Sequence, residues 1–145
     1  MTDTAVNLQI PSKHSDGLQS FPVLAAAHIY KGQLCMVTAA GYLDDAVATA
    51  NSFFAGVAAD ECDNSAGASA ALSCNCYRKG RFLLTFSDSL TVANIGDKVW
   101  ATDNQVCTIT SATNKQKVGN IVGIHSTSQA WVDIDSGTGS PELGA

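Results

Sequence analysis

Hydrophobic residues occur in short runs from about residue 21 to about residue 135, and Gly, Asn and Asp separate these runs. Several runs alternate with a period of two, so that Phe82, Leu84 and Phe86 share one side of a predicted strand. Short apolar runs bounded by turn residues are typical of β-strands. The pattern predicts strands at residues 26–30, 34–38, 53–59, 69–77, 81–86, 98–102, 106–109, 118–125 and 130–135.

Helical periodicity is nearly absent from the chain. The best candidate is the Ala-rich stretch 44–51, which fits either two helical turns or a long hairpin loop. The first 27 residues are polar, with Pro11 and Gly17 as breakers, and we expect an extended arm there. The expected organisation is an N-terminal arm (1–27), a β domain (28–135) and a flexible, Gly-rich C-terminal tail (136–145).

A weak internal repeat organises the predicted strands. The first copy comprises segments 31–38, 41–43, 54–58 and 80–84, and the second comprises 95–102, 105–107, 121–125 and 129–133. Gly32 and Gly96 precede the first strand of each copy, and Gly56 and Gly123 lie inside the third strand, where glycine permits a bulge. Two such units would close on each other, although chance similarity between hairpins is the alternative. The expected fold class is all-β, a small barrel or sandwich built from two weakly similar β units, with an extended N-terminal arm.

The chain is poor in charge. Only 14 % of its residues are charged, where about 25 % is typical, whereas Ala, Ser, Thr and Gly together occupy 59 of 145 positions. A free β-rich monomer with so few charges is poorly protected from association. The composition therefore favours a protein whose surface is largely covered by neighbours in an assembly.

The charge balance also bears on partners. The net charge is −5, and the one basic cluster, formed by Arg78, Lys79 and Arg81, is too small for a phosphate-binding face. No apolar stretch is long enough to span a membrane, and residues 1–10 carry no export signal. We therefore expect no nucleic acid and no membrane as partners, and synthesis in a cytoplasm.

Five cysteines are present, at positions 35, 62, 74, 76 and 107. An odd number without an export signal predicts reduced thiols rather than a disulfide framework. Cys74 and Cys76, with Cys62 upstream, have the ligand type of a thiolate metal site, but no second closely spaced pair completes a tetrahedron. Buried or half-buried free thiols are the favoured interpretation, and no metal or cofactor is expected.

Motifs of catalysis are also missing from the sequence, which holds no Gly-x-Ser-x-Gly, phosphate-loop or His-Glu-x-x-His signature. His125 with Asp133 or Asp135, and Cys35 or Cys107 as nucleophile, is the one conceivable set. A surface histidine at a strand end is the favoured interpretation, and no catalytic residue is assigned.

Two tryptophans are candidate contact residues. Trp100 shares a strand face with Lys98 and Thr102, and Trp131 shares one with Asp133 and Asp135. Aromatic side chains on a polar face are typical of contact surfaces. The alternative, held equally, is that one or both cap an open barrel end.

The order of these strands resembles the small β-rich decoration (cement, head-stabilising) proteins of tailed bacteriophages. The resemblance rests on segments 32–38, 55–59, 81–85, 96–100 and 122–124 and on the final Trp-Val-Asp-Ile strand, and it spans residues 31–135. It implies a protein that binds the outside of an icosahedral shell and staples neighbouring coat subunits. In that family the polar arm often lies along the coat or a neighbouring copy, a role that would suit residues 1–27, whereas residues 60–71 have no counterpart.

The expected function is therefore that of a non-enzymatic structural virion protein on the capsid exterior. The expected partners are the major capsid protein and further copies of this chain, as a homotrimer or a dimer. The candidate contact residues are Leu8, Ile10, Leu18, Phe21, Trp100 and Trp131. The alternatives are a carbohydrate- or receptor-binding β module on a virion or cell surface, and a small cysteine-dependent hydrolase with a low-pKa thiol beside His28 or His125.

Overall fold

The computed structural model describes residues 17–135, whose regular secondary structure is all β except for one short 3₁₀ turn, η1 (Val92–Asn94). The all-β prediction is confirmed. In the first half of the chain lie β1 (Leu18–Pro22), β2 (His28–Ile29), β3 (Leu34–Val37), β4 (Leu43–Asp45), β5 (Phe53–Ala58), β6 (Cys62–Asp63) and β7 (Ser73–Tyr77). The second half contains β8 (Lys79–Phe86), β9 (Lys98–Ala101), β10 (Val106–Thr108), β11 (Lys117–Ile124) and β12 (Gln129–Asp135).

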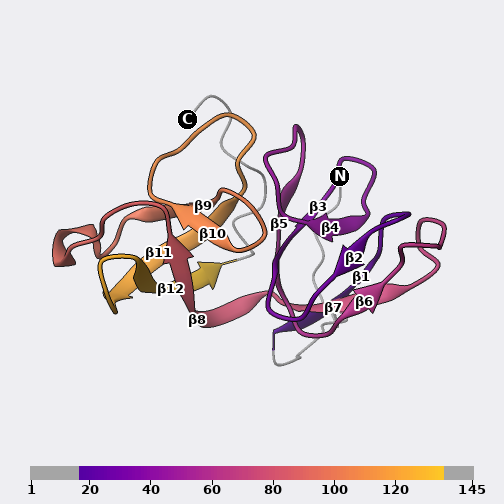
Figure 1. The fold of residues 1–145 in the computed structure, drawn as a ribbon, viewed down its shortest axis with the longest axis horizontal. Coiled ribbons are helices and arrows are strands. Elements are labelled where there is room, and N and C mark those ends of the chain that lie inside the picture. The colour runs from indigo at the N-terminus through magenta and orange to yellow at the C-terminus, as the bar shows by residue number, and fades with distance from the viewer. Residues whose placement is uncertain (1–16, 136–145) are drawn as a thin grey trace, which may run out of the picture.

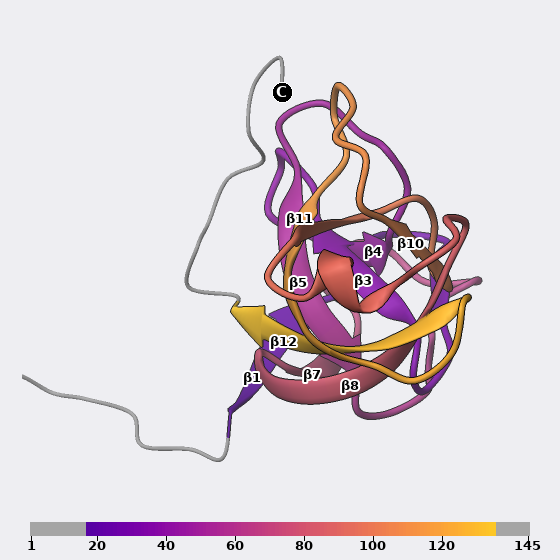
Figure 2. The same ribbon diagram turned by 90° about the vertical axis from the view of Figure 1, so that its left-hand side faces the viewer.

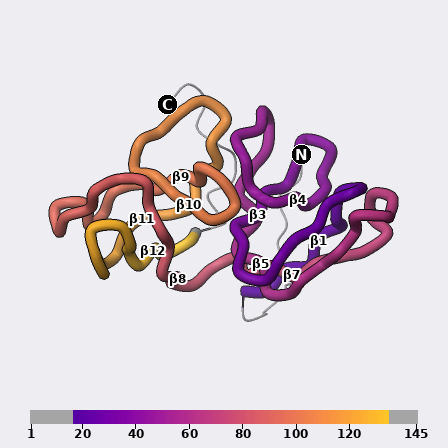
Figure 3. The backbone as a smooth tube through the Cα atoms, in the orientation of Figure 1, coloured from indigo at the N-terminus to yellow at the C-terminus, as the bar shows by residue number. Residues whose placement is uncertain are grey.

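The strands form two units side by side along the long axis of the molecule (Figure 1). The first is a five-stranded sheet in the order β1-β7-β5-β3-β4, with a small β2-β6 ribbon beside it. The second is a closed barrel in the order β10-β8-β12-β11-β9. The backbone trace crosses from one unit to the other once, between β7 and β8 (Figure 3). The barrel is thus formed by the second unit alone, and the expectation that the two units close on each other is wrong.

The two units have the same strand connectivity. Replacing β1, β3, β4, β5 and β7 by β8, β9, β10, β11 and β12 turns the order of the first sheet into that of the barrel. The barrel closes by parallel pairing of β8 with β10, where Cys107 lies opposite Phe86. At the corresponding place in the first unit, a parallel bridge joins Val23 to Leu43. The predicted internal repeat is therefore present, and the first unit is a less completely closed version of the second.

Pairing registers correct two details of that repeat. Cys35 in β3 and Val99 in β9 are equivalent positions of the two repeat copies. Cys35 pairs with Gly56 of β5, and Val99 pairs with Gly119 of β11. The counterpart of Gly56 is therefore Gly119 and not Gly123. The expected fourth element of the first copy, 80–84, belongs to β8, which opens the second unit, and β7 takes the fourth place instead.

Strand β1 is not among the expected strands, because its apolar residues Leu18, Phe21 and Pro22 neither form a run nor alternate with a period of two. It pairs antiparallel with β7 over its whole length, from Leu18 opposite Tyr77 to Pro22 opposite Ser73. This part of the predicted arm is thus a strand of its own unit, while residues 1–16 and 136–145 lie outside the described residues. The Ala-rich stretch 44–51 contains no helix; it begins in β4 and continues as the connection to β5.

Each unit has an apolar core, and the larger core extends across the junction. The barrel core includes Val99, Val118, Ile121 and Val132, and Leu34 and Phe54 of the first unit pack into the same cluster. Gln116, fully buried at this junction, donates from Nε2 to Ser52 Oγ (2.7 Å) and to the Val47 carbonyl (2.9 Å). The two units are therefore packed into one body by apolar contacts and by a buried amide.

Candidate functional site: the outer face of the barrel

Trp131, in β12 of the barrel (Figure 1), lies on the outer face of this unit. Neighbouring residues Ala130 and Val132 point into the core and are fully buried, whereas Trp131 is 43 % exposed. Opposite it lie Leu83 of β8 and Gly123 of β11. A Cβ on Gly123 would lie 3.8 Å from Cδ1 of Trp131, so the glycine leaves room for the indole to lean across β11.

A bulge adds a further apolar side chain beside Trp131. Between Ile121 and Gly123 the pairing of β11 with β12 shifts by one residue, so that Val122 has no partner and is 39 % exposed. Leu83, Val122 and Trp131 together define what we call the outer apolar face. Its members come from three adjacent strands, which explains why none of them forms a continuous run in the sequence.

The first unit provides an internal comparison for this face. Cys76 in β7 is equivalent to Val132 in β12, so the residue before it, Asn75, is equivalent to Trp131. Ser20 pairs with Asn75 as Leu83 pairs with Trp131, so Ser20 is equivalent to Leu83. Both residues are exposed, and the Asn75 amide donates to Asp60 Oδ2 at 3.2 Å. The same position of the same fold is therefore polar in one unit and apolar in the other. The fold does not require an apolar outer face, so another requirement must account for it.

A second exposed apolar segment lies at η1, the helical turn that faces the viewer in Figure 2. Val92 and Ile95, in and directly after η1, are 76 % and 51 % exposed. This segment runs beside β11, since the Gly96 N–H donates to the Ile121 carbonyl (2.8 Å) and the Ile121 N–H donates to the Asp97 carbonyl (3.0 Å). The barrel thus carries exposed large apolar side chains on two neighbouring segments, η1 with Ile95 and β11.

Charged and polar groups border the outer apolar face. Arg81 and Asp133 lie opposite each other and are both exposed, and Thr85 lies opposite Gln129. An apolar centre with a polar border is the usual composition of a protein interface, in which aromatic side chains supply much of the binding free energy.

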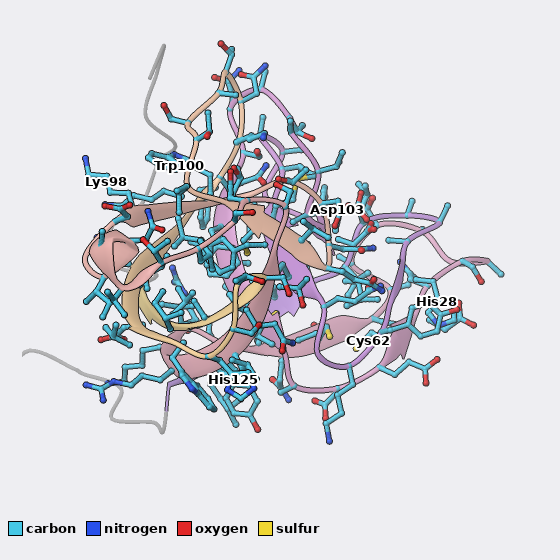
Figure 4. All side chains as sticks on the ribbon, turned by 60° about the vertical axis from the view of Figure 1, so that its left-hand side comes forward. His28, Cys62, Lys98, Trp100, Asp103 and His125 are labelled. Atoms are coloured by element: carbon cyan, nitrogen blue, oxygen red, sulfur yellow. The ribbon has the colours of Figure 1, made fainter. Side chains whose placement is uncertain are left out.

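The two tryptophans have different environments. Trp100, labelled in Figure 4, is only 7 % exposed, so little of its ring is left for the predicted contact role. It pairs with Thr108 of β10 and Lys117 of β11, so it lies on the central strand of the β10-β9-β11 part of the barrel, with a cross-strand neighbour on either side. Trp131 is the tryptophan that a partner can reach.

None of the other predicted contact residues that the structure describes lies on the outer apolar face. Leu8 and Ile10 lie outside the described residues. Leu18 is 40 % exposed on β1, at the edge of the first sheet. Phe21 is half-buried against the first core, and the Arg78 guanidinium lies 5.6 Å from its ring centroid. Phe21 is therefore largely used within its own chain, and the structure does not bring Leu18 or Phe21 to the face that carries Trp131.

Sequence reasoning missed Leu83, Val122, Val92 and Ile95. A signal for Leu83 was available, because it interrupts the alternation of Phe82, Leu84 and Phe86 with a large apolar residue on the outer side. Val122 carried no such signal, since its exposure depends on the bulge.

The described cysteine and histidine side chains bear on the alternative of a cysteine-dependent hydrolase. Cys107 is fully buried in the barrel core, and this burial raises its pKa to about 12. His125 is exposed in the turn between β11 and β12, and Figure 4 shows it well away from Cys62. His28 lies on the β2-β6 ribbon, with Nε2 2.8 Å from Glu61 Oε2 and Nδ1 3.6 Å from Asp63 Oδ1. A thiol that is protonated at neutral pH is a poor nucleophile.

Metal-binding and membrane-spanning features can be assessed for residues 17–135. Among them, no group of three or more His, Cys, Asp and Glu side chains could hold a metal ion. The two carboxylates near His28 contact opposite nitrogens of its ring and so do not converge on one point. No helix in this part of the chain is long and apolar enough to cross a membrane. Comparison with protein-family models, with curated proteins and with solved structures found no match to this chain.

Proposed function

We propose that this chain is a structural protein of a phage virion that binds the outer surface of an icosahedral capsid and staples neighbouring coat subunits. The observation that carries the proposal is the outer apolar face, which has a polar counterpart in the first unit. An apolar face that the fold does not need is best explained by a partner that covers it. The charge-poor composition and the resemblance to phage decoration proteins support the same conclusion.

The mechanism of stapling follows from the two-unit body. A body of two packed units does not bend freely at its junction, so contacts made by both units bind neighbouring coat subunits at fixed distance and orientation. Many weak contacts repeated over a shell add up through multivalency, and single contacts need not be strong. We propose that the chain acts as a homo-oligomer, a trimer or a dimer, on the virion exterior after synthesis in the host cytoplasm.

Binding to undecorated capsids tests the proposal. Purified protein is mixed with capsids that lack it, and bound protein is measured after sedimentation together with the temperature at which the capsids break. Decoration should raise that temperature. The variant Trp131→Asn, which gives the second unit the residue of the first, should bind less, while Asn75→Ala at the matching position should bind as the wild type does. Failure of the wild-type protein to sediment with capsids contradicts the proposal.

A carbohydrate-binding module is the second candidate, because Trp131 is an exposed aromatic ring with Gln129 and Asp133 on the same strand face. Aromatic rings flanked by polar side chains are a suitable platform for pyranose rings. A glycan array read with wild type and Trp131→Asn decides between the two. Trp131-dependent binding to glycans, without binding to capsids, would favour this candidate.

A further inference from the structure

Four of the five thiols gather inside the first unit. Cys35 of β3 and Cys74 and Cys76 of β7 are buried in its core, and Cys62 of β6 is half-buried beside them. Interaction between neighbouring thiols is the largest cause of two raised pKa values. The Cys35 thiol raises the pKa of Cys76, and the Cys76 thiol raises the pKa of Cys74. For Cys62, burial is the largest cause and the contact with Cys74 the next. The thiols thus form a continuous series from Cys35 to Cys62.

Three of these thiols have an ordinary structural explanation. In the barrel, the places of Cys35, Cys74 and Cys76 are taken by Val99, Ala130 and Val132, which are fully buried. At those places a cysteine is a small core residue. Cys62 differs from them, because it lies in the segment between β5 and β7, where the barrel has only the short turn between β11 and β12.

Strand geometry decides which of these thiols can become bonded. Cys35 and Cys76 lie on strands separated by β5, about 9 to 10 Å apart, which exceeds the Cα separation that a disulfide spans. Cys74 and Cys76 lie two residues apart on one strand, so their Cβ atoms are roughly 6 to 7 Å apart, also too far. Cys62 and Cys74 lie on different segments, and each thiol is hydrogen-bonded to the backbone next to the other, which makes them the candidate pair.

The contacts between Cys62 and Cys74 are reciprocal. The Cys62 thiol donates to the carbonyl of Ser73, the residue before Cys74, with 3.6 Å between Sγ and O. The Cys74 thiol donates to the carbonyl of Asp60, two residues before Cys62, at the same distance of 3.6 Å. Each sulfur therefore lies against the backbone that carries the other.

We propose that Cys62 and Cys74 are an oxidisable pair that forms an intramolecular disulfide when the folded protein meets a peroxide. The Cys62 thiolate attacks one peroxide oxygen and becomes a sulfenic acid, while hydroxide leaves and takes up the thiol proton as water. The Cys74 sulfur then attacks the Cys62 sulfur, the S–S bond forms, and the sulfenic oxygen leaves as a second water with the Cys74 proton. Two thiols lose two electrons in total, and one hydrogen peroxide accepts them.

The exposure and the pKa of Cys62 predict that the disulfide forms slowly and that Cys62 is oxidised first. Cys62 is the only one of the two thiols that solvent reaches, so it reacts with the oxidant first. Its pKa is raised to about 12, so the thiolate is scarce at neutral pH and the rate rises with pH. The pair therefore stays reduced in a reducing cytoplasm and closes under prolonged oxidation outside it.

The disulfide would fasten the segment of residues 63–73 to the sheet. This segment is already held by Asn64, which is buried and donates from Nδ2 to the carbonyls of Leu24 (3.0 Å) and Ala68 (2.9 Å). A covalent closure of such a loop restricts the unfolded chain. Oxidation should raise the thermal midpoint of unfolding by roughly 5 to 10 °C.

The test uses the full chain, reduced and folded, treated with hydrogen peroxide at neutral and at alkaline pH. Remaining thiols are then alkylated, and the intact mass and the linked peptides are determined. The wild type should lose two thiols together, faster at higher pH, with Cys62 joined to Cys74. Cys62→Ser and Cys74→Ala, the latter copying Ala130 of the barrel, should form no disulfide.

A matched control removes the other two thiols. The double variant Cys35→Val, Cys76→Val, which copies the barrel residues, should form the same disulfide as the wild type. A different bonded pair, a disulfide between two chains, over-oxidation of Cys62 alone, or unchanged thiols in the folded protein would each overturn the proposal. The outcome does not depend on capsid binding, so failure here is distinct from failure of the proposed function.

Discussion

Gly56 in β5 and Gly119 in β11 occupy the same position in the two halves of the molecule. A Cβ on Gly56 would overlap the carbonyl oxygen of Tyr77 in β7, and a Cβ on Gly119 would overlap that of Asp133 in β12, the counterpart of Tyr77. In both units, therefore, the third strand approaches the fourth too closely for any side chain. Equivalent glycines at equivalent close approaches are strong evidence that the units share one design.

We expect Gly56→Ala and Gly119→Ala each to lower the free energy of unfolding by about 3 kcal/mol or more, because backbone must move to admit the methyl group. Gly56→Ala is further strained because its φ is +140°. Gly123→Ala, on the same strand as Gly119, meets only ordinary van der Waals contacts and should cost less than about 1 kcal/mol. Denaturant unfolding measures all three, and a Gly119→Ala as mild as Gly123→Ala would contradict the assigned close approach.

The two tryptophans should respond oppositely to truncation. Trp100→Ala removes a buried ring and should destabilise the protein by about 3 kcal/mol. Trp131→Ala removes a half-exposed ring and should cost less than about 1 kcal/mol, while reducing capsid binding. Unfolding and capsid sedimentation on the same samples separate the two effects. If Trp131→Ala proves as destabilising as Trp100→Ala, the outer apolar face is structural.

Gln116 is expected to couple the two units. Gln116→Ala leaves a cavity and removes the side-chain hydrogen bonds that Gln116 makes across the junction, to Val47, Ser52 and the Met36 sulfur, so we expect a loss of about 2 to 3 kcal/mol and a broader unfolding transition. Asn104→Ala serves as the control, because Asn104 joins the same units through a half-buried bond of 2.8 Å to Asp45. It should cost about 1 kcal/mol without broadening the transition. A sharp transition in Gln116→Ala would argue against this coupling role.

Asp44 should make the protein less stable as pH rises. Burial, and then the neighbouring side chain of Asp45, raise the pKa of Asp44 from 3.8 to about 6, so the folded state holds its proton more tightly than the unfolded state. Stability from this group is complete below pH 3.8 and is lost as pH rises through 6. Because Asp44 is only half-buried, the loss after solvent screening is about 1 kcal/mol. Asp44→Asn should remove this part of the pH dependence and be more stable than the wild type at pH near 7.

Much of the fold follows from local patterns. The alternation of Phe82, Leu84 and Phe86 predicts β8, because successive side chains of a strand point to opposite faces. Turn residues near Gly96 and after Ala101 mark the two ends of β9, because tight turns favour particular residue types. Strand β1 escaped prediction because its pairing with β7 supplies what its own sequence lacks, an apolar run. The sequence shows the repeat but aligns Gly56 with Gly123 instead of Gly119. Bulges in β11 shift its register against β9 and β12, and the spacing of residues along the chain does not show such shifts.

The sequence by itself determined the β class, the duplicated order of strands and a surface with few charges, because these depend on residue type and near neighbours. Only the tertiary structure decided that β8 opens the second unit, that Trp100 is buried while Trp131 is exposed, and that Cys62 meets Cys74. Those outcomes depend on which strands pair and in which register. A pairing shifted by one residue moves every side chain to the opposite face of the sheet.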